Sequence, residues 1–248
     1  MSALLLHGLQ CAKAPPRLHA PPHLRIPAGD LVALCTPADP AALRAAEDGQ
    51  DESALIDGAL AHDRLLRACL PAGPLLPVRF GTAFSGASAL RRALHEDAPS
   101  YRRALCRIGC AWEFALRATL TAEAARAAGP IDGAGERAPD GRTFLKIRRQ
   151  RRDSRQRRRE NRLSWAERLA ARVLALAEDS APARTEPDRL LSLSLLVERR
   201  RVAALEACIA EATAEATRLG LVLSLVGPLP AYSFVEMPRS SAREMAYA

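Results

Sequence analysis

The stretch of sequence that decides the fold runs from residue 189 to residue 226 and reads RLLSLSLLVERRRVAALEACIAEATAEATRLGLVLSLV. Its first part, Arg189–Val197, alternates in a way that is typical of a β-strand. Glu198–Leu219 has apolar residues at helical spacing and stops at Gly220, which predicts an amphipathic helix with a glycine cap. Leu221–Val226 predicts another strand. A helix that connects neighbouring strands on one face of a sheet predicts an α+β sandwich of ferredoxin-like type.

The rest of the chain also mixes predicted strands and helices. We expect strands at 4–9, 30–35 and 106–119, an extended element at 75–84 and a proline-rich loop at 13–28. We expect helices at 39–70 with a break near Gly49, from a cap at 85–88 to Glu96, and again after Pro99. This order predicts an α+β protein of two domains, 1–105 and 106–238, followed by a loose tail at 239–248.

The helix predicted at 39–70 carries one apolar stripe in its second half. Its members recur at spacings of three and four: Leu55, Ala59, His62, Leu65, Leu66 and Cys69. A histidine on such a stripe is more often a core residue than a catalytic one, so we expect His62 to be buried.

A second stretch, Lys146–Arg162 (KIRRQRRDSRQRRRENR), has ten basic and two acidic side chains and accounts for the formal net charge of +8. It is the first half of a long helix predicted at 143–179, and Pro182 and Pro187 predict a linker after it. The second half of the helix has an apolar stripe: Leu163, Ala166, Leu169, Ala170, Val173, Leu174 and Ala177. The first half has no such stripe, so this helical arm must project into solvent or lie across a partner.

Three explanations for the basic arm remain open. It could bind nucleic acid by counterion release, although no aromatic residue in Lys146–Arg162 offers a platform for stacking bases. It could be a solvated helix with ion pairs, such as Asp153 with Arg149 or Arg157. It could also dock onto an acidic protein surface, where exposed arginines such as Arg152 would contact a partner.

No motif of a known catalytic chemistry occurs in the sequence. It lacks the Walker-type phosphate loop, the dinucleotide G-x-G-x-x-G, the nucleophile elbow G-x-S-x-G and the zinc motif H-E-x-x-H. His19 and His23 are separated by prolines and form no rigid metal pair. The six cysteines form no C-x-x-C pair, and we expect them to be reduced core residues. We therefore predict no catalytic, cofactor or metal site, and a protein that is not an enzyme.

The N-terminus, MSALLLHGLQCAK, has no basic region typical of a signal peptide. No segment approaches the roughly 18 apolar residues that a membrane-spanning helix needs. We therefore expect a cytoplasmic protein with no membrane partner.

Three motifs in the right order resemble one known family. They are LPVRFGT at Leu76–Thr82, GRTFLKIR at Gly141–Arg148 and GPLPAYSFV at Gly227–Val235, with LLVER at Leu195–Arg199 before the last helix. The chain resembles the gas vesicle protein F/L family over about residues 4–236. It departs from that family at Leu229 and Ala231, which stand where the family has tryptophan and proline, and at Leu195–Leu196, where the family has tyrosine and leucine.

The resemblance implies a non-enzymatic accessory protein of gas vesicle formation. Family members look like two-domain α+β proteins with a modified ferredoxin-like second domain and a long charged helical insertion. The resemblance further implies binding to the hydrophobic shell protein (GvpA-like), help in nucleating or assembling the vesicle, contacts with other accessory proteins, and a cytoplasmic location on the vesicle. It favours partner docking for the basic arm, and nucleic-acid binding through 146–162 stays the alternative function.

The candidate partner-binding residues lie in three places. In the arm they are Arg149, Arg152 and Arg157. In the LPVRFGT motif they are Arg79 and Phe80, and alternation would place Arg79 on the face opposite both its apolar neighbours. In the last motif, Tyr232 and Phe234 are expected to share a face of an extended segment. For Arg79 the alternative to partner contact is a structural role in which it ties neighbouring carbonyls or a carboxylate. For Tyr232 and Phe234 the alternative is core packing.

Overall fold

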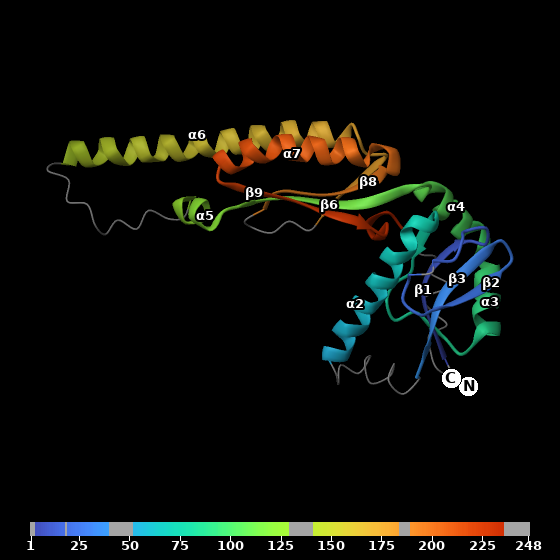
Figure 1. Cartoon of the computed structure of the whole chain (residues 1–248). Helices are drawn as coiled ribbons and strands as arrows, with labels where there is room; N and C mark the ends of the chain where they lie inside the picture. The colour runs from blue at the N-terminus through green and yellow to red at the C-terminus, as the bar shows by residue number, and fades with distance from the viewer. Residues whose placement is uncertain (1–2, 18, 40–51, 129–140, 184–188, 236–248) are drawn as a thin grey trace. The chain divides into compact units, whose positions relative to one another are not determined.

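The structure of the chain is a computed structural model. It describes all residues except 1–2, 18, 40–51, 129–140, 184–188 and 236–248 (Figure 1). The chain divides into two compact units, residues 1–113 with 227–248, and residues 114–226. The predicted domains, which meet near residue 105, stay a prediction. In the structure, however, the described residues 227–235 belong to the first unit.

The first unit is built on an antiparallel sheet with the strand order β2-β3-β1-β4, in which β5 also pairs with β1. Its strands are β1 (Ala3–Cys11), β2 (Leu24–Ala28), β3 (Leu31–Ala38), β4 (Leu75–Pro77) and β5 (Ala83–Phe84). The register of β1 against β3 shifts between Leu6 and Gly8, so His7 occupies a β-bulge. A bulge redirects a side chain, and this one positions the site described below.

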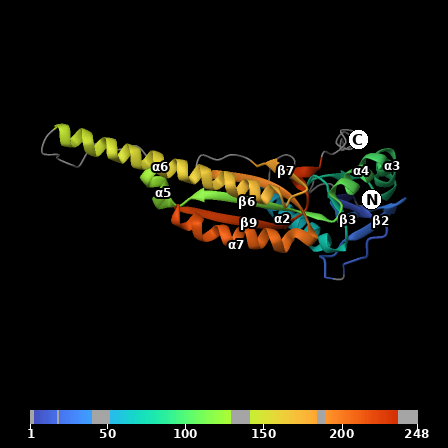
Figure 2. The same cartoon turned by 90° about the horizontal axis from the view of Figure 1, so that it is seen from above.

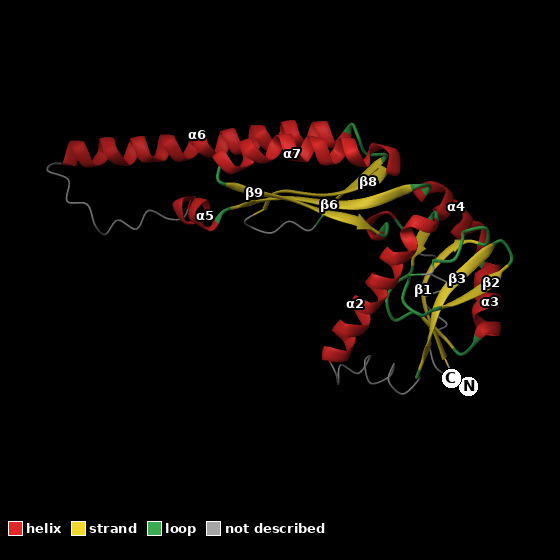
Figure 3. Cartoon of the chain, in the orientation of Figure 1, coloured by secondary structure: helices red, strands yellow, loops and turns green. Residues whose placement is uncertain are grey.

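Helices cover both faces of this sheet, which explains why nearly every residue of β1 and the first five of β3 are buried (Figure 3). The α2 helix (Glu52–Cys69), followed by a 3₁₀ turn at Leu70–Ala72, lies on one face. The α3 helix (Ala87–Glu96) and the α4 helix (Ala98–Ile108) lie on the other. The core under α2 includes Leu34, Leu65, Leu66, Cys69, Leu70 and Leu75.

Three predictions in this unit were wrong at their boundaries. Residues 24–28 form β2 rather than loop, because an edge strand tolerates a proline such as Pro27. The α4 helix continues to Ile108 and ends at Gly109, which has φ +54°, so the strand predicted from Cys106 starts at Ala111. The buried stripe of α2 begins at His62, since the two earlier members are exposed. The predicted break near Gly49 lies outside the described residues.

The second unit has a sheet with the strand order β7-β8-β6-β9. Its elements, some of which reach beyond the unit, are β6 (Ala111–Leu120), α5 (Ala122–Ala128), α6 (Gly141–Leu174), β7 (Asp179–Pro182), β8 (Arg189–Glu198), a 3₁₀ turn (Arg199–Arg201), α7 (Val202–Arg218) and β9 (Leu221–Leu229). The predicted strand–helix–strand unit at 189–226 is thus confirmed with small changes at its ends.

The α6 and α7 helices lie side by side on one face of this sheet (Figure 2). Ion pairs join them, with 2.9 Å between Arg168 Nη2 and Glu215 Oε1 and 2.5 Å between Arg172 Nη2 and Glu211 Oε2. The first half of α6 continues past the end of α7. The strand β9 alternates between covered and exposed residues along 221–226, as expected of a sheet with helices on one face.

The long helix differs from its prediction in two ways. It ends at Leu174 rather than 179, and residues 179–182, part of them in the predicted linker, form the strand β7 against β8. Its buried face includes Trp165, Ala166, Leu169 and Val173, whereas Leu163 and Leu174 are more than 40% exposed. Trp165 was absent from the predicted stripe, which began two residues earlier at Leu163, on the exposed side of the helix.

The cysteines are free, as expected, but only half of them are core residues. Cys35, Cys69 and Cys208 are buried, and Cys11, Cys106 and Cys110 are exposed. Apolar neighbours in the sequence therefore did not guarantee burial at the ends of β1 and α4. Among the described residues, no helix is long and apolar enough to cross a membrane.

Candidate functional site

Two buried histidines form the base of the site in the first unit. The bulge in β1 turns His7 toward α2, where its Nδ1 lies 2.9 Å from Nδ1 of His62. The other ring nitrogen of His7 lies 2.9 Å from Oγ1 of Thr36 on β3. The side chains of both histidines are almost fully buried. The expectation that His62 is a core residue is confirmed, and His7 is the partner that the sequence pattern did not reveal.

Both imidazoles are held neutral by their surroundings. Burial, and then the nearby His62, lower the pKa of His7 from 6.5 to about 4. Burial also lowers the pKa of His62, while Asp63 and the Val78 carbonyl oppose that effect. In the Nδ1–Nδ1 hydrogen bond one ring must donate and the other must accept. Protonation of both Nδ1 atoms would set two donors against each other.

The second ring nitrogen of His62, Nε2, is buried and has no hydrogen-bond partner of ordinary geometry within the described part of the chain. His62 also lines a pocket of about 460 Å³. The pocket lies between α2, residues 77–80 and residues 232–235, and all of them belong to the first unit. Its lining residues are Ala59, His62, Asp63, Pro77, Val78, Arg79, Phe80, Tyr232 and Val235.

Phe80 forms one wall of this pocket. Its ring meets the ring of His62 edge to face, with 5.6 Å between the centroids and 73° between the planes. It also lies tightly over Gly58 of α2, where a Cβ atom would come within 2.8 Å of Phe80 Cζ. The glycine therefore gives the aromatic ring of the LPVRFGT motif room to lie against the helix.

Tyr232 is another lining residue of the pocket. Its hydroxyl donates to Asp63 Oδ1 at 3.3 Å, and Asp63 also pairs with Arg67 at 2.6 Å. Burial, followed by the charge of Asp63 and its hydrogen bond, raises the pKa of Tyr232. At neutral pH Tyr232 is therefore an uncharged phenol that links the C-terminal motif to α2.

A buried carboxylate holds this C-terminal segment in place. Glu113 of β6 accepts hydrogen bonds from the backbone nitrogen of Ser233 at 2.8 Å and from its hydroxyl at 2.7 Å. Residues Tyr232–Phe234 form a 3₁₀ turn, not the extended segment that was predicted. As a result, Tyr232 is 41% exposed while Phe234 is 6% exposed, so the prediction that they share a face was wrong.

Three of the predicted residues, Arg79, Phe80 and Tyr232, therefore meet at one pocket, whereas Phe234 is a buried core residue. Arg79 is exposed next to the buried Val78, and Phe80 is partly buried. His7 and Glu113, which support the pocket, were missed. Each is a buried polar residue in a mostly apolar strand, and their spacing carries no signal until the fold brings them to α2 and to Ser233.

The exposed part of α2 adds an apolar patch beside the pocket. Leu55, Ile56 and Leu60 are 42%, 52% and 52% exposed. With Ala59, which lines the pocket, they recur at spacings of four along one side of the helix. Exposed apolar side chains that adjoin a pocket are a candidate contact surface. We refer to Leu55, Ile56, Ala59 and Leu60 as the α2 patch.

The basic arm is a separate feature, within the second unit. Arg149, Arg152 and Arg157 are all exposed on α6. Arg149 and Arg152 lie on one face with Asp153 and Gln156, and Arg157 lies off it. The ion pair between Asp153 and Arg149 or Arg157, which one of the three explanations allows, does not form among the described residues. Within the same residues, no group of three or more His, Cys, Asp or Glu side chains could hold a metal ion.

These features define an α+β protein with two antiparallel sheets, a surface pocket with an apolar rim and a long basic helix. The chain belongs to the gas vesicle synthesis protein GvpL/GvpF family, whose sequence model matches residues 19–236. The resemblance seen in the motifs is thereby confirmed.

Solved structures agree on the fold. The crystal structure of the gas vesicle protein GvpF from Anabaena sp. has a TM-score of 0.69 and 13% identity, covering 96% of this chain and 98% of that one. The GvpF structure from Microcystis aeruginosa has a TM-score of 0.66 and 12% identity, covering 95% and 99%. No curated protein sequence matches this chain. At these identities the structural likeness shows the fold.

Proposed function

We propose that the protein is a non-enzymatic accessory factor of gas vesicle formation that binds the hydrophobic shell protein and helps to nucleate or assemble the vesicle. The observation that carries the proposal is the family match over residues 19–236, in a family of gas vesicle synthesis proteins. We place its action in the cytoplasm, on the growing vesicle.

The first unit offers the surface that best suits an apolar shell subunit. The α2 patch exposes leucine and isoleucine side chains, and the adjoining pocket is walled by Phe80 and Tyr232. We propose that an apolar side chain of the shell protein enters this pocket while its neighbours cover the α2 patch. Arg79, exposed at the rim, is then placed to contact a polar group of the same partner.

The basic arm is proposed to serve other contacts. Arg149, Arg152 and Arg157 are exposed on a helix whose first half has no apolar stripe. Acidic faces of other accessory proteins match this charge. Such contacts should weaken with salt, because exposed charges are screened within roughly 8–10 Å at physiological ionic strength.

We also propose that the second unit is a modified ferredoxin-like domain. In the second sheet the elements follow as β6, α6, β7, β8, α7 and β9, with the strand order β7-β8-β6-β9. A β-α-β-β-α-β order with both helices on one face supports a modified ferredoxin-like domain. In this description α6 carries the long charged extension.

The experiment is a nuclease-treated pull-down of the tagged protein co-expressed with its shell protein. The key variant is Leu60→Ser in the α2 patch, and the matched control is Leu145→Ser, since Leu145 is 64% exposed on α6. Loss of shell protein with Leu60→Ser and retention with Leu145→Ser are expected. Equal retention in both variants would rule out the α2 patch as the contact.

A parallel variant replaces Arg149, Arg152 and Arg157 by glutamine. We expect it to retain the shell protein and to lose other accessory proteins, with the wild-type contacts weakening as salt is raised. Recovery of nucleic acid without any shell protein, when the nuclease is omitted, would contradict the proposal and restore the nucleic-acid alternative.

A further inference from the structure

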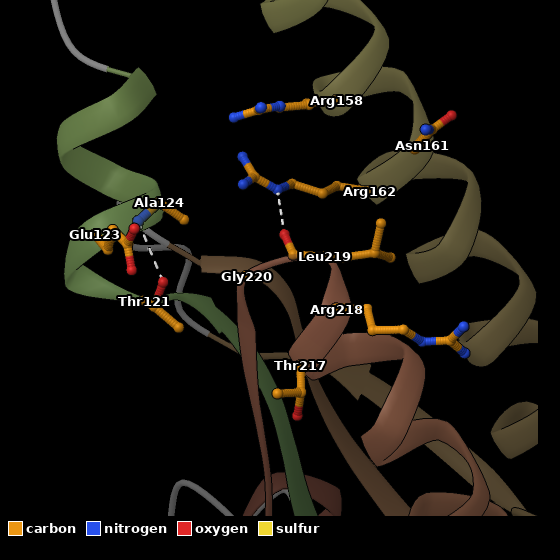
Figure 4. Close-up of a pocket in the computed structure, with 10 residues that line it drawn as sticks. All are labelled: Thr121, Glu123, Ala124, Arg158, Asn161, Arg162, Thr217, Arg218, Leu219 and Gly220. Carbon is orange, nitrogen blue, oxygen red and sulfur yellow. Dashed lines mark hydrogen bonds between the residues drawn. The ribbon is translucent and has the colours of Figure 1, made fainter.

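A second pocket lies in the second unit, at the point where α6 continues past the end of α7 (Figure 4). Its volume is about 400 Å³. The start of α5, the end of α7 and one side of α6 enclose it, and these elements belong to the same unit. Its lining residues are Thr121, Glu123, Ala124, Arg158, Asn161, Arg162, Thr217, Arg218, Leu219 and Gly220.

Two arginines one helical turn apart point into this pocket. Figure 4 shows the side chains of Arg158 and Arg162 projecting from α6 in the same direction, toward the start of α5. The Nε atom of Arg162 donates to the Leu219 carbonyl at 2.8 Å, which fixes the guanidinium at the end of α7. Its two Nη groups remain directed to the pocket side.

The backbone around Gly220 is shaped for this close approach. Gly220 has φ +72°, a conformation that favours glycine. A Cβ atom there would lie 3.0 Å from Ala124 Cβ and 3.3 Å from Arg162 Nη2. The glycine therefore allows the guanidinium to lie against the loop that closes the pocket.

Within the described part of the chain, no ion pair neutralises the positive charge in the pocket. Glu123 also lines the pocket, but no ion pair joins it to Arg158 or Arg162 among the described residues. Burial lowers the pKa of Arg162, and the nearby charge of Arg158 lowers it further. Arg218 lines the pocket too, although its side chain points away from the two arginines in Figure 4.

The hydroxyl of Thr121 adds a further donor. Thr121 Oγ1 accepts a hydrogen bond from the backbone nitrogen of Ala124 at 3.2 Å. Its own proton is therefore available to an acceptor inside the pocket. Two guanidinium forks and one hydroxyl suit an acceptor with several oxygens and a double negative charge.

We propose that the pocket formed by Arg158, Arg162 and Thr121 binds a phosphate group, either free phosphate or the phosphate of a small monoester. A phosphate dianion neutralises both arginines, whereas a single carboxylate leaves one positive charge unpaired. The volume of about 400 Å³ also has room for a small group beyond the phosphate. None of the described residues that line the pocket is aromatic, so they offer no platform for a nucleotide base.

The test is isothermal titration calorimetry of the full chain with inorganic phosphate, at constant ionic strength set with sodium chloride. Arg158→Gln is the key variant because it leaves the Arg162–Leu219 contact intact. We expect it to weaken phosphate binding about tenfold or more, as loss of a charge-assisted hydrogen bond does.

Arg149→Gln is the matched control, since it removes the same charge from the same helix at a distance of about 13 Å along the axis. It should change the affinity by less than about twofold, because salt screens charges at that range. Glu123→Gln should tighten binding, because it removes the carboxylate that the described lining residues place in competition with the ligand.

Two further titrations identify the source of the phosphate. Glycerol phosphate that binds more tightly than inorganic phosphate indicates a monoester, and the reverse indicates the free ion. Acetate that binds as tightly as phosphate overturns the proposal in favour of a carboxylate ligand. Equal weakening of phosphate binding by Arg158→Gln and Arg149→Gln also overturns the proposal, because it shows a general effect of the charge of the helix. The proposal fails as well if the wild-type protein does not bind phosphate.

Discussion

The Nδ1 atoms of His7 and His62 lie 2.9 Å apart inside the first unit, and this hydrogen bond joins the bulge of β1 to the first buried turn of α2. The pair orients His62, whose other nitrogen is buried beside the pocket walled by Phe80 and Tyr232. Two neutral imidazoles satisfy this geometry, and a doubly protonated pair does not. The stability of the first unit should therefore depend on pH.

We predict that the protein loses stability as the pH falls from about 6.5 to about 4. The pKa of His7 is about 4 in the folded protein and 6.5 in the unfolded chain. As the pH falls, the unfolded chain therefore takes up the proton before the folded protein does. The contribution of His7 to the stability is therefore fully present above pH 6.5 and is lost progressively below it. This difference in pKa corresponds to about 3 kcal/mol for His7.

Urea unfolding at a series of pH values measures this effect. Comparison with His7→Gln isolates the contribution of the pair from that of the carboxylates, and His95→Gln is the control because His95 is exposed. The slope between pH 6.5 and 4 should be smaller in His7→Gln and unchanged in His95→Gln. An identical slope in all three proteins would contradict the prediction.

Glu113→Ala should destabilise the protein by about 1–3 kcal/mol, because it leaves the backbone nitrogen of Ser233 without its buried acceptor. The change is measured by urea unfolding at pH 7. Glu206→Ala, on the exposed side of α7, is the control and should stay within about 0.5 kcal/mol of wild type. A cost of the same size in both variants would show that Glu113 does not hold the C-terminal segment.

Gly8→Ala should cost about 2 kcal/mol. A Cβ atom at Gly8 would lie 2.9 Å from both Leu66 Cδ2 and the Leu76 carbonyl oxygen, so the sheet and α2 must move apart to admit it. Gly86→Ala is the matched control, since nothing lies within 4 Å of a Cβ atom there and its backbone is extended. Thermal unfolding of the two variants compares them directly, and equal melting temperatures would refute the tight packing at Gly8.

Tyr232→Phe and Tyr232→Ser separate the two roles of this side chain. The hydroxyl makes one hydrogen bond of 3.3 Å to Asp63 at the surface, so Tyr232→Phe should cost less than about 1 kcal/mol and retain the shell protein. Tyr232→Ser removes the ring that walls the pocket and should abolish retention in the pull-down. Retention by both variants would exclude Tyr232 from the proposed contact.

Local patterns in the sequence determined a large part of this protein. The strand, helix and strand of 189–226 follow from periodicity, and the basic arm follows from composition. The motifs at 76–82 and 227–235 were sufficient to recognise the family, because they are short and local. Even the burial of His62 was visible, since its neighbours on α2 recur at helical spacing.

The tertiary structure alone decided which distant residues meet. Tyr232 contacts Asp63 across 169 positions, Glu113 holds Ser233 across 120, and His7 meets His62 across 55. Arg162 reaches Leu219 in the same way, across 57 positions. Periodicity reports which face of an element is buried, but it contains no information on what packs against that face. That choice depends on strand order, bulges and close approaches at glycine, which are settled only when the whole sheet and its helices are packed together.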